Sequence, residues 1–297
     1  MNITALIVTY NRLGKLKKTL MATSKLPFDH IVIVNNASTD GTKSWLNAIT
    51  DANITILHSE DNNGGAGGFR LGSEYISKNL ETEWIVFFDD DAYPAGDFIS
   101  NFSSITKNEK EIYCCEVRTP QGKICKMNLP WKKRTITLTD NLNYIRHPEN
   151  YIAQPNVKDE VLTFSFVGCV ISKYVLANSY KYIQQDLFIY YDDVFFSYNL
   201  TLHGYKIFYH PDLKFIHDIK ENNSWDGQEW KIYYLSRNLF LYEKYFPGKD
   251  FFSITSKCVR LTKYFIDGLK CKHKISYYAY LLKGIFHGMK NTGGRNH

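Results

Sequence analysis

Two groups of adjacent carboxylates are the side chains in this sequence best suited to chemistry. Asp89–Asp91 directly follow the apolar run Trp84–Phe88, and Asp192–Asp193 follow an aromatic stretch much later in the chain. Adjacent carboxylates repel one another, so three of them can be buried together only if a cation compensates their charge. Oxygen ligands of this kind suit Mg²⁺ or Mn²⁺, usually shared with a phosphate. The triplet could instead be a solvated acidic turn before Pro94, but the strand before it favours a metal–phosphate site.

The carboxylate pair Asp192–Asp193 is suited to a different task, the removal of a proton. One of two adjacent carboxylates in a closed pocket has its pKa raised, as a general base near neutral pH requires. The pair also opens a predicted helix that ends at Gly204, so Asp192 could cap that helix while Asp193 favours its dipole. The two interpretations are compatible, because an N-capping carboxylate can also face a cleft.

His217 lies near the end of a predicted strand, Leu213–Asp218, and could complete the divalent site. A lone histidine is more often a structural hydrogen-bonding residue. Two carboxylates leave a divalent cation short of protein ligands, however, and histidine is a common metal ligand. The sequence therefore offers the aspartate triplet and His217 as one candidate metal centre.

The elements that must position these residues alternate between strands and helices in the first half of the chain. Apolar runs predict the strands Ile3–Thr9, His30–Asn35 and Ile54–His58, and helical spacing predicts the helices Leu13–Ser24, Lys43–Ile49 and Arg70–Asn79. This alternation is typical of an α/β fold, in which parallel βαβ units with right-handed crossovers build a central sheet flanked by helices.

A glycine-rich segment, Asn62–Phe69, separates the third predicted strand from the third predicted helix. Four of its residues are glycines, namely Gly64, Gly65, Gly67 and Gly68. Glycines let the backbone approach a ligand closely and place N–H groups at a helix start. The spacing is not the dinucleotide fingerprint GxGxxG, which also belongs after a first strand rather than a third. The segment therefore favours a nucleotide or sugar pocket.

The second half of the chain is less regular. We expect a hairpin over Ile112–Lys126, an irregular excursion over Met127–Asp159, a strand over Val161–Ile171 that contains Gly168, a strand over Lys206–Tyr209, a lid over Ile219–Gly227 and a helix over Trp230–Tyr245. This organisation predicts a nucleotide-binding half over residues 1–110, an acceptor and catalytic half over residues 111–245, and a C-terminal extension over residues 246–297.

The C-terminal extension is basic and has helical periodicity. The chain has a net charge of +6, and residues 231–297 contain 13 Lys and Arg against 3 Asp and Glu, which leaves the rest of the chain at −4. Apolar residues form a stripe along Phe251, Ile254, Cys258, Leu261 and Phe265, and Tyr277–Met289 repeats the pattern. Such helices could pack on the main domain, on a partner subunit or on an anionic membrane surface.

The sequence predicts a cytoplasmic protein whose basic helices could lie on the inner face of the cell membrane. No apolar run approaches the roughly 20 residues that span a bilayer. The segment Met1–Thr4 has no signal-peptide layout. The six cysteines have no CxxC or zinc spacing, and scattered cysteines suit a reducing compartment.

Together these motifs resemble the large inverting family of GT-A glycosyltransferases, which includes many bacterial polysaccharide-assembly enzymes. The resemblance covers residues 3–245 and rests on Val8–Arg12, Val34–Thr42, the aspartate triplet and Asp192–Asp193. Within that family the chain looks most like the galactofuranosyltransferases, through Asn63–Phe69, Tyr191–Asp193, Phe215–His217 and Tyr234–Asn238. The order and spacing of the motifs carry the resemblance, since each motif is short.

The resemblance implies a role for each motif. Asp89, Asp91 and His217 would hold the Mn²⁺ or Mg²⁺ that bridges the donor diphosphate. Thr9, Tyr10 and Arg12 would line the uracil pocket, with Asn35 on the base edge where the family often has Asp. The donor sugar would lie near Asn63, Gly64, Gly65, Gly67, Gly68 and Asp90. Asp193 would be the catalytic base and Asp192 an acceptor-hydroxyl contact, while Phe166, Gly168 and Arg237 would border the acceptor cleft.

These roles predict a metal-dependent, inverting glycosyltransferase of cell-surface polysaccharide synthesis, such as O-antigen or capsule. It would transfer galactofuranose from UDP-galactofuranose to a glycan or polyprenyl-diphosphate-linked acceptor. No nucleic-acid partner is expected, and the protein could form a homo-oligomer. A transferase of the same fold that uses dTDP-rhamnose or another UDP-hexose is the alternative. A sugar-phosphate nucleotidyltransferase would need a glycine-rich loop where this chain has Tyr10–Gly14, and a silent glycan-binding scaffold would not need the intact aspartates and His217.

Overall fold

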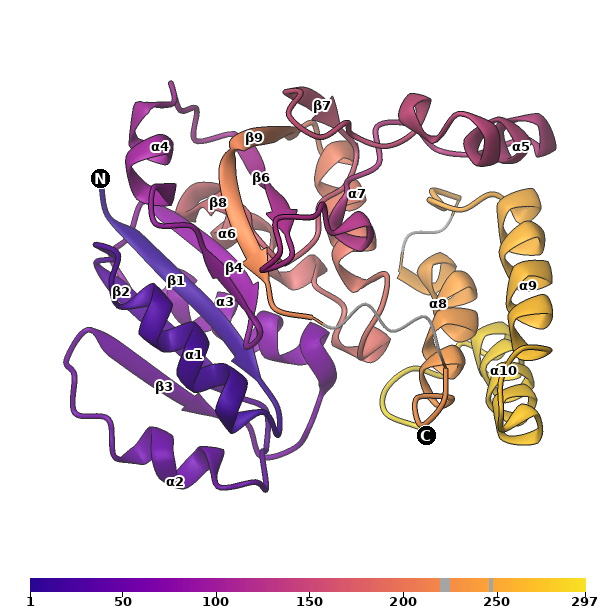
Figure 1. The fold of residues 1–297 in the computed structure, drawn as a ribbon, viewed down its shortest axis with the longest axis horizontal. Coiled ribbons are helices and arrows are strands. Elements are labelled where there is room, and N and C mark those ends of the chain that lie inside the picture. The colour runs from indigo at the N-terminus through magenta and orange to yellow at the C-terminus, as the bar shows by residue number, and fades with distance from the viewer. Residues whose placement is uncertain (220–224, 246–247) are drawn as a thin grey trace.

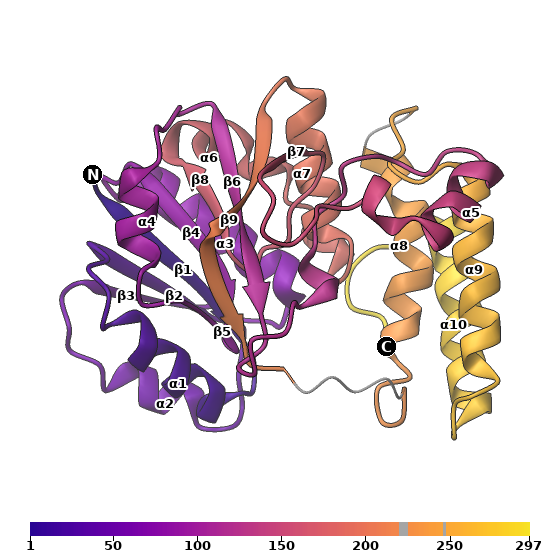
Figure 2. The same cartoon turned by 45° about the horizontal axis from the view of Figure 1, so that its top comes forward.

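The computed structural model describes residues 1–219, 225–245 and 248–297. These residues form a nine-stranded sheet with helices on both faces, and a group of helices from the end of the chain stands beside it (Figures 1 and 2). The predicted class, an α/β fold with a mostly parallel sheet and a helical C-terminal extension, is confirmed. Most of the predicted lid over Ile219–Gly227 lies outside the described residues.

The first half of the sheet is parallel, as the alternation of strands and helices predicts. Its strands are β1 (Ile3–Thr9), β2 (His30–Asn35), β3 (Ile54–His58) and β4 (Trp84–Asp89), in the order β3-β2-β1-β4. The connecting helices are α1 (Leu13–Thr23), α2 (Thr42–Asn47) and α3 (Gly64–Asn79). The central strands β1 and β4 are apolar runs buried on both faces. Because these strands are parallel, their carboxyl ends lie at one edge of the sheet.

The second half of the sheet is mixed. β8 (Cys169–Ser172) pairs antiparallel with β4, and the sheet continues through β6 (Glu111–Arg118), β9 (Lys206–His217) and β5 (Ala92–Pro94). β6 and β9 are parallel, whereas β5 and β7 (Asp159–Val161) run antiparallel to β9. The helices of this half are α4 (Phe98–Ser104), α6 (Lys173–Ser179) and α7 (Asp192–Leu202), with 3-10 turns at Tyr180–Tyr182 and Gln185–Leu187.

Three predicted elements of this half differ from the structure. The hairpin over Ile112–Lys126 has one strand, β6, and a single bridge on its return, between Arg118 and Ile124. The strand over Val161–Ile171 is interrupted, because Gly168 turns the chain with φ +78° immediately before β8. The two strands predicted over 206–209 and 213–218 are one strand, β9, with an irregular register after His210.

The excursion predicted to be irregular over Met127–Asp159 contains a helix, α5 (Leu138–Arg146), between 3-10 turns at Lys126–Asn128 and Pro148–Asn150. A capping box between Thr137 and Asp140 starts α5. The excursion also reaches the C-terminal helices: the hydroxyls of Thr135 and Ser256 are 2.8 Å apart, and both views place α5 beside α9 (Figures 1 and 2).

The C-terminal helices are α8 (Lys231–Tyr245), α9 (Ile254–Gly268) and α10 (Lys274–Met289). Glycines let α10 pack closely on α8, since a Cβ on Gly284 would lie 2.1 Å from Ser236 Oγ and one on Gly288 would lie 2.6 Å from the carbonyl of Arg237. α8 stands between the sheet and the outer helices (Figure 1). The division of the chain after residue 245 stays a prediction.

Candidate active site

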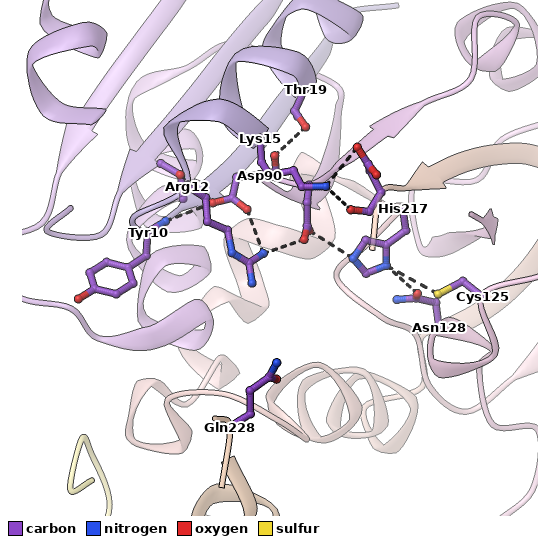
Figure 3. Close-up of polar contacts among 12 residues, drawn as sticks. Tyr10, Arg12, Lys15, Thr19, Asp90, Cys125, Asn128, His217 and Gln228 are labelled. Atoms are coloured by element: carbon purple, nitrogen blue, oxygen red, sulfur yellow. Dashed lines mark hydrogen bonds and ion pairs between the residues drawn. The ribbon is translucent and has the colours of Figure 1, made fainter. Parts of the chain in front are cut away.

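The register between two strands joins His217 to the aspartate triplet. Asp90–Asp91 form the turn after β4, and β5 begins at Ala92, which pairs directly with His217 on β9. The Asp218 N–H donates to the carbonyl of Asp91 at 2.7 Å and fixes the turn against the end of β9. His217 Nε2 consequently lies 3.3 Å from Asp91 Oδ1 (Figure 3). Two of the three predicted metal ligands are therefore in contact.

Arg12, from the loop after β1, occupies the other side of Asp91. Its guanidinium lies 2.7 Å from Asp91 Oδ2 and 3.4 Å from Asp90 Oδ1 (Figure 3). Burial acts to raise the pKa of Asp91, but the hydrogen bond to His217 and the charge of Arg12 outweigh it and hold the pKa below its ordinary value. Asp91 is thus an ionised carboxylate between two cations.

His217 is held in one orientation from its far side. Its Nδ1 lies 3.1 Å from Asn128 Oδ1 and 3.8 Å from Cys125 Sγ. Asn128 Nδ2 donates to Ser165 Oγ at 2.8 Å, so Asn128 Oδ1 accepts from His217 Nδ1–H. Burial opposes the charged form of His217, but its hydrogen bonds and the nearby carboxylates raise its pKa to about 9. Nε2 is therefore the ring nitrogen that faces the carboxylates.

The chemistry of these residues fits a divalent cation. Burial and the charges of Asp91 and Asp90 raise the pKa of Asp89 to about 7, although His217 and Arg12 favour its charged form, and a divalent cation would relieve this crowding. Carboxylate oxygens suit Mg²⁺ and Mn²⁺, and imidazole is the softer ligand of the set. Binding would release the proton from His217 Nε2, since a histidine ligand must be neutral.

Another trio of potential metal ligands lies just before α8 and in the turn between α9 and α10. Within the described ranges, Asp226, Glu229 and Cys271 are the one group of three whose ligand atoms all lie within 4.8 Å of one another. Backbone N–H groups already occupy its carboxylates, because Lys272 donates to Asp226 at 3.0 Å and Gly227 donates to Glu229 at 3.1 Å. This trio ties the segment before α8 to the turn between α9 and α10, away from the aspartate triplet.

The carboxylate of Asp90 is directed at the loop after β1. It accepts from the Thr9 hydroxyl at 2.8 Å and from the Tyr10 N–H at 3.3 Å, and the Asp90 carbonyl accepts from the Thr19 hydroxyl at 2.7 Å (Figure 3). Burial raises the pKa of Asp90 to about 6, although Arg12 favours its charged form. Asp90 therefore anchors Thr9, Tyr10 and Arg12 on the triplet, and its predicted contact with the donor sugar stays a prediction.

The loop before α7 is strained and packs against the start of α3. Phe188, Tyr190 and Tyr191 have φ of +66°, +66° and +64°, left-handed values that bulky residues rarely adopt. The Ala66 N–H donates to the carbonyl of Phe188 at 3.1 Å. A Cβ on Gly64, whose φ is +70°, would lie 2.0 Å from that carbonyl. Glycine at this position therefore permits the contact between the two halves of the candidate site.

α8 holds the strained loop through two buried side chains. Arg237 has no exposed surface and donates to the carbonyls of Asp186–Leu187, both at 2.8 Å. Asn238 Nδ2 donates at 3.0 Å or less to the carbonyls of Leu187 and of Ile189–Tyr190. Because its guanidinium is bonded to backbone, Arg237 does not border an open cleft as predicted. Sequence analysis missed the role of Asn238, the next residue in the same motif.

Burial raises the pKa values of both carboxylates in the Asp192–Asp193 pair that follows this loop. Burial and the charge of Asp193 hold the pKa of Asp192 well above its ordinary value. Burial also raises the pKa of Asp193 to about 6, but hydrogen bonds from the backbone of Val194 and Phe166 and from the Ser165 hydroxyl limit the rise. The charge therefore resides mainly on Asp193.

A chain of polar contacts connects the two groups of carboxylates. It runs from Asp91 to His217, from His217 to Asn128, and from Asn128 to Ser165, with distances of 3.3, 3.1 and 2.8 Å. The Ser165 hydroxyl then hydrogen-bonds Asp193. Sequence analysis missed Asn128 and Ser165, because they lie in segments without a regular hydrophobic period.

The predicted glycine loop is the first turn of α3, so the predicted helix start at Arg70 is wrong. Asn36 Nδ2 donates to the carbonyl of Gly64 at 2.7 Å, and Asn36 Oδ1 accepts from the Asn63 N–H at 3.1 Å. A Cβ on Gly67 would lie 2.3 Å from Cβ of Asn63. The glycines thus allow a tight helix start where the chain leaves β3.

Two further glycines of this turn adjoin other parts of the fold. A Cβ on Gly68 would lie 2.4 Å from Val8 Cγ1 on β1, so this glycine seats α3 on the sheet. A Cβ on Gly65 would lie 4.0 Å from Asp192 Oδ2. The N-terminus of α3, which favours anionic ligands, therefore lies beside the carboxylate pair.

Phe166 and Gly168, predicted at the acceptor cleft, are both buried. Phe166 stacks on Phe69 with ring centroids 4.4 Å apart. A Cβ on Gly168 would lie 2.9 Å from Cβ of Cys115, so glycine is needed there for packing and for its positive φ. The backbone of Phe166 is the part of this segment that contacts Asp193.

Asn35 lines a separate pocket of about 330 Å³ at the carboxyl ends of β2 and β3, together with Ser38, Lys43, His58 and Glu60 among others. Asn35 Oδ1 accepts from the Ser38 N–H at 3.1 Å, and Asn35 Nδ2 lies 3.0 Å from His58 Nδ1. Burial and the charge of Lys43 lower the pKa of His58, so the neutral ring accepts from Asn35. The orientation of the Asn35 amide is therefore fixed.

The sequence matches the family described as glycosyl transferase family 2 over residues 4–179, more than half of the chain. It is similar to Agl10 of Haloferax volcanii, a low-salt glycan biosynthesis hexosyltransferase, with 22% identity over 278 residues. That match covers 89% of this chain and 84% of the relative.

Solved structures show the same fold. Residues 1–349 of S. aureus TarS superpose with a TM-score of 0.59 at 13% identity, over 98% of this chain and 81% of that one. The chain spans 40% of a longer TarS structure. The mannosyltransferase PcManGT of Pyrobaculum calidifontis, in complex with GDP-Man and Mn²⁺, superposes with a TM-score of 0.57 at 16% identity. That match covers 97% of this chain and 87% of the mannosyltransferase. The fold is the GT-A type that the sequence motifs imply.

Proposed function

The chain belongs to glycosyl transferase family 2, and from that membership we propose that it transfers a hexose from a nucleotide-sugar donor to a glycan acceptor, with inversion at the anomeric carbon. The observation that carries the proposal is the junction at one sheet edge. There, Asp91 and His217 meet at 3.3 Å, and polar contacts continue through Asn128 to Ser165, which lowers the pKa of Asp193 at the start of α7. A site for a leaving diphosphate and a site for a base are thus joined.

Inversion needs one displacement and one base. Asp193 is the base of our proposal, because it carries most of the pair's charge at neutral pH and can take the proton of an acceptor hydroxyl. Burial holds the pKa of Asp192 well above its ordinary value, and in its protonated form Asp192 would donate a hydrogen bond to the acceptor or the donor sugar. A divalent cation held by Asp89, Asp91 and His217 would neutralise the charge that grows on the leaving diphosphate. A retaining hydrolase would instead need two carboxylates that flank the scissile bond.

The donor that we propose is UDP-galactofuranose. Its sugar would lie at the N-terminus of α3, beside Gly65 and Asp192. Its base would lie in a pocket lined by Thr9, Tyr10 and Arg12. Asn35, whose amide is held by the Ser38 N–H and by His58, would lie at the edge of the base. The similar PcManGT binds Mn²⁺ together with its nucleotide sugar, which supports a divalent cation here.

The rival donor is dTDP-rhamnose or another UDP-hexose, and direct binding separates the dTDP donor from the UDP donors. Calorimetric titration with UDP and dTDP, each with Mn²⁺ and with EDTA, should give tight binding of UDP that EDTA abolishes. Tight binding of dTDP without binding of UDP would exclude UDP-galactofuranose. A screen of UDP-sugars against glycan and polyprenyl-diphosphate-linked acceptors then identifies the transferred sugar, and ¹H NMR of the product identifies its anomeric configuration.

The acceptor that we propose is a lipid-linked glycan of cell-surface polysaccharide synthesis, met at the cytoplasmic face of the membrane. The relative Agl10 is named for glycan biosynthesis. The acceptor would approach from α8, because Gln228, just before this helix, points toward the triplet (Figure 3). Lys231 adds a cation there: burial and the charge of Arg12 lower its pKa, and Asp91 opposes that change.

A further inference from the structure

The helix α10 has two apolar faces, of which one is covered. Its inner face consists of Tyr277, Leu281, Gly284 and Gly288, which are buried against the neighbouring helices. The opposite face consists of residues at alternating spacings of four and three, which form one stripe along a helix. They are Ile275, Ala279, Leu282, Phe286 and Met289. All five are exposed, with Ile275 at 89% and Met289 at 70%.

The exposed stripe continues onto α9. Phe265 on α9 stacks on Tyr278 of α10 with ring centroids 6.1 Å apart, and the Tyr278 hydroxyl donates to the carbonyl of Phe265. Phe265 and Leu269 are both exposed. We call the α10 stripe together with Phe265 and Leu269 the outer apolar face. It lies on the far side of α8 from the sheet (Figures 1 and 2).

The charge around the outer apolar face is mainly positive, because Asp267, the acidic residue between Phe265 and Leu269, is paired with Lys263. Residues 268–297 contain six Lys and Arg and no Asp or Glu. On α10, Lys283 and Lys290 follow the stripe residues Leu282 and Met289 and are exposed, and Lys274 precedes Ile275 and is exposed as well. The face is thus an apolar strip bordered by cations, which is the pattern of helices that lie in a membrane interface.

We propose that the outer apolar face of α9 and α10 binds the surface of a bilayer that contains anionic lipids. A second copy of this chain would bring the same positive charges opposite one another, whereas anionic headgroups complement them. In the part of the chain that the structure describes, no helix is long and apolar enough to cross a bilayer. The helices therefore lie along the surface, with Ile275, Leu282 and Phe286 among the acyl chains. This binding goes beyond glycosyl transfer and needs neither donor nor acceptor.

Vesicle flotation of the full-length protein tests the proposal. The protein should float with vesicles of phosphatidylglycerol and phosphatidylcholine and stay behind with phosphatidylcholine alone. Leu282→Glu with Phe286→Glu should weaken binding on the order of 100-fold, about tenfold per change, because each change removes one apolar side chain from among the acyl chains. Changing Lys274, Lys283 and Lys290 to Gln should weaken binding to a similar extent, at about fivefold per charge.

Met21→Glu is the matched control, because Met21 is a 64% exposed apolar residue on α1, on the opposite side of the molecule. It should bind vesicles like the wild type. The proposal is overturned if the wild type does not float with anionic vesicles, or if the lysine variant, whose changes are all at exposed positions, floats as well as the wild type. It is also overturned if sedimentation without lipid shows a dimer that Leu282→Glu and Phe286→Glu dissociate, since the face would then bind a second copy. UDP binding, measured in parallel, separates a failure of this proposal from a failure of the proposed function.

Discussion

Replacing Asp193 by Asn is the sharpest test of the proposed chemistry, because it removes the base and keeps the shape of the side chain. A positioned general base contributes about 10²–10⁴-fold to rate, so kcat should fall by that factor, equal to about 3–5 kcal/mol. In our proposal the donor diphosphate binds at the aspartate triplet and not at Asp193, so the Kd for UDP with Mn²⁺ should stay within about twofold of the wild type. The assays are single-turnover transfer and calorimetric titration of UDP.

The pH dependence of activity tests the assignment of Asp193 as the base independently. The pKa of Asp193 is about 6, raised by burial, and the base acts in its deprotonated form, so wild-type activity should rise as pH increases through 6. Because this pKa is that of the free enzyme, kcat/KM should rise about tenfold from pH 5 to pH 7.5, as the ionised fraction changes from about 0.09 to about 0.97. The residual activity of Asp193→Asn should lose this dependence.

Asp192→Asn is the matched control for this test. Burial and the charge of Asp193 hold the pKa of Asp192 well above its ordinary value, so a neutral amide is a closer replacement for Asp192 than for Asp193. We expect a smaller loss of kcat than for Asp193→Asn and a retained rise through pH 6. If Asp192→Asn carries the whole loss and Asp193→Asn keeps its activity, then Asp192 is the base and the assignment made from the hydrogen bonds of the pair is refuted.

Three further changes test how the site is held together. Asn238→Ala should destabilise the fold by about 1–3 kcal/mol, because it leaves buried carbonyls unpaired, and should lower kcat more than the Kd for UDP changes; a denaturant melt and kinetics measure both effects. Asn128→Ala should weaken Mn²⁺ binding about 10–100-fold, because His217 loses the acceptor that orients its ring. Asn128→Asp, which keeps an acceptor, is the control. Calorimetry measures Mn²⁺ binding to both variants, and equal affinities of the two variants would contradict this account. Arg12→Gln should tighten Mn²⁺ binding in the absence of donor, because it frees the Asp91 oxygen that Arg12 holds at 2.7 Å; an unchanged or weaker affinity would show that Arg12 does not compete with the cation.

The parallel half of the fold could be predicted from sequence because its physical signal is local. Ile3–Thr9 and Trp84–Phe88 are apolar runs that can only be buried strands, and the triplet had to follow one of them. The helix α5 was missed for the opposite reason. Its start depends on the capping box of Thr137 and Asp140 and its packing on α9, whereas its own sequence is mostly polar.

The contacts within the candidate site depend on register and long-range packing, which sequence periodicity does not contain. His217 was singled out as a possible ligand, but only the pairing of Ala92 with His217 brings it to Asp91. Arg237 was placed at a cleft because arginine beside aromatic residues suits phosphate or carboxylate binding. The backbone carbonyls that bind it belong to a strained loop, and no local pattern predicted that strain.

The hydrogen bonds from α8 to the loop before α7 constrain the design of chimeras between relatives. Arg237 and Asn238 hold residues 186–190, and α10 supports α8 through Gly284 and Gly288. A chimera that replaces everything after residue 230, in order to change the membrane or the acceptor that the protein binds, would therefore also replace the residues that hold this loop. The loop leads directly to Asp193, the base of our proposal. The loop and the three helices should be transplanted as one cassette, with a crossover placed in the sheet before residue 186.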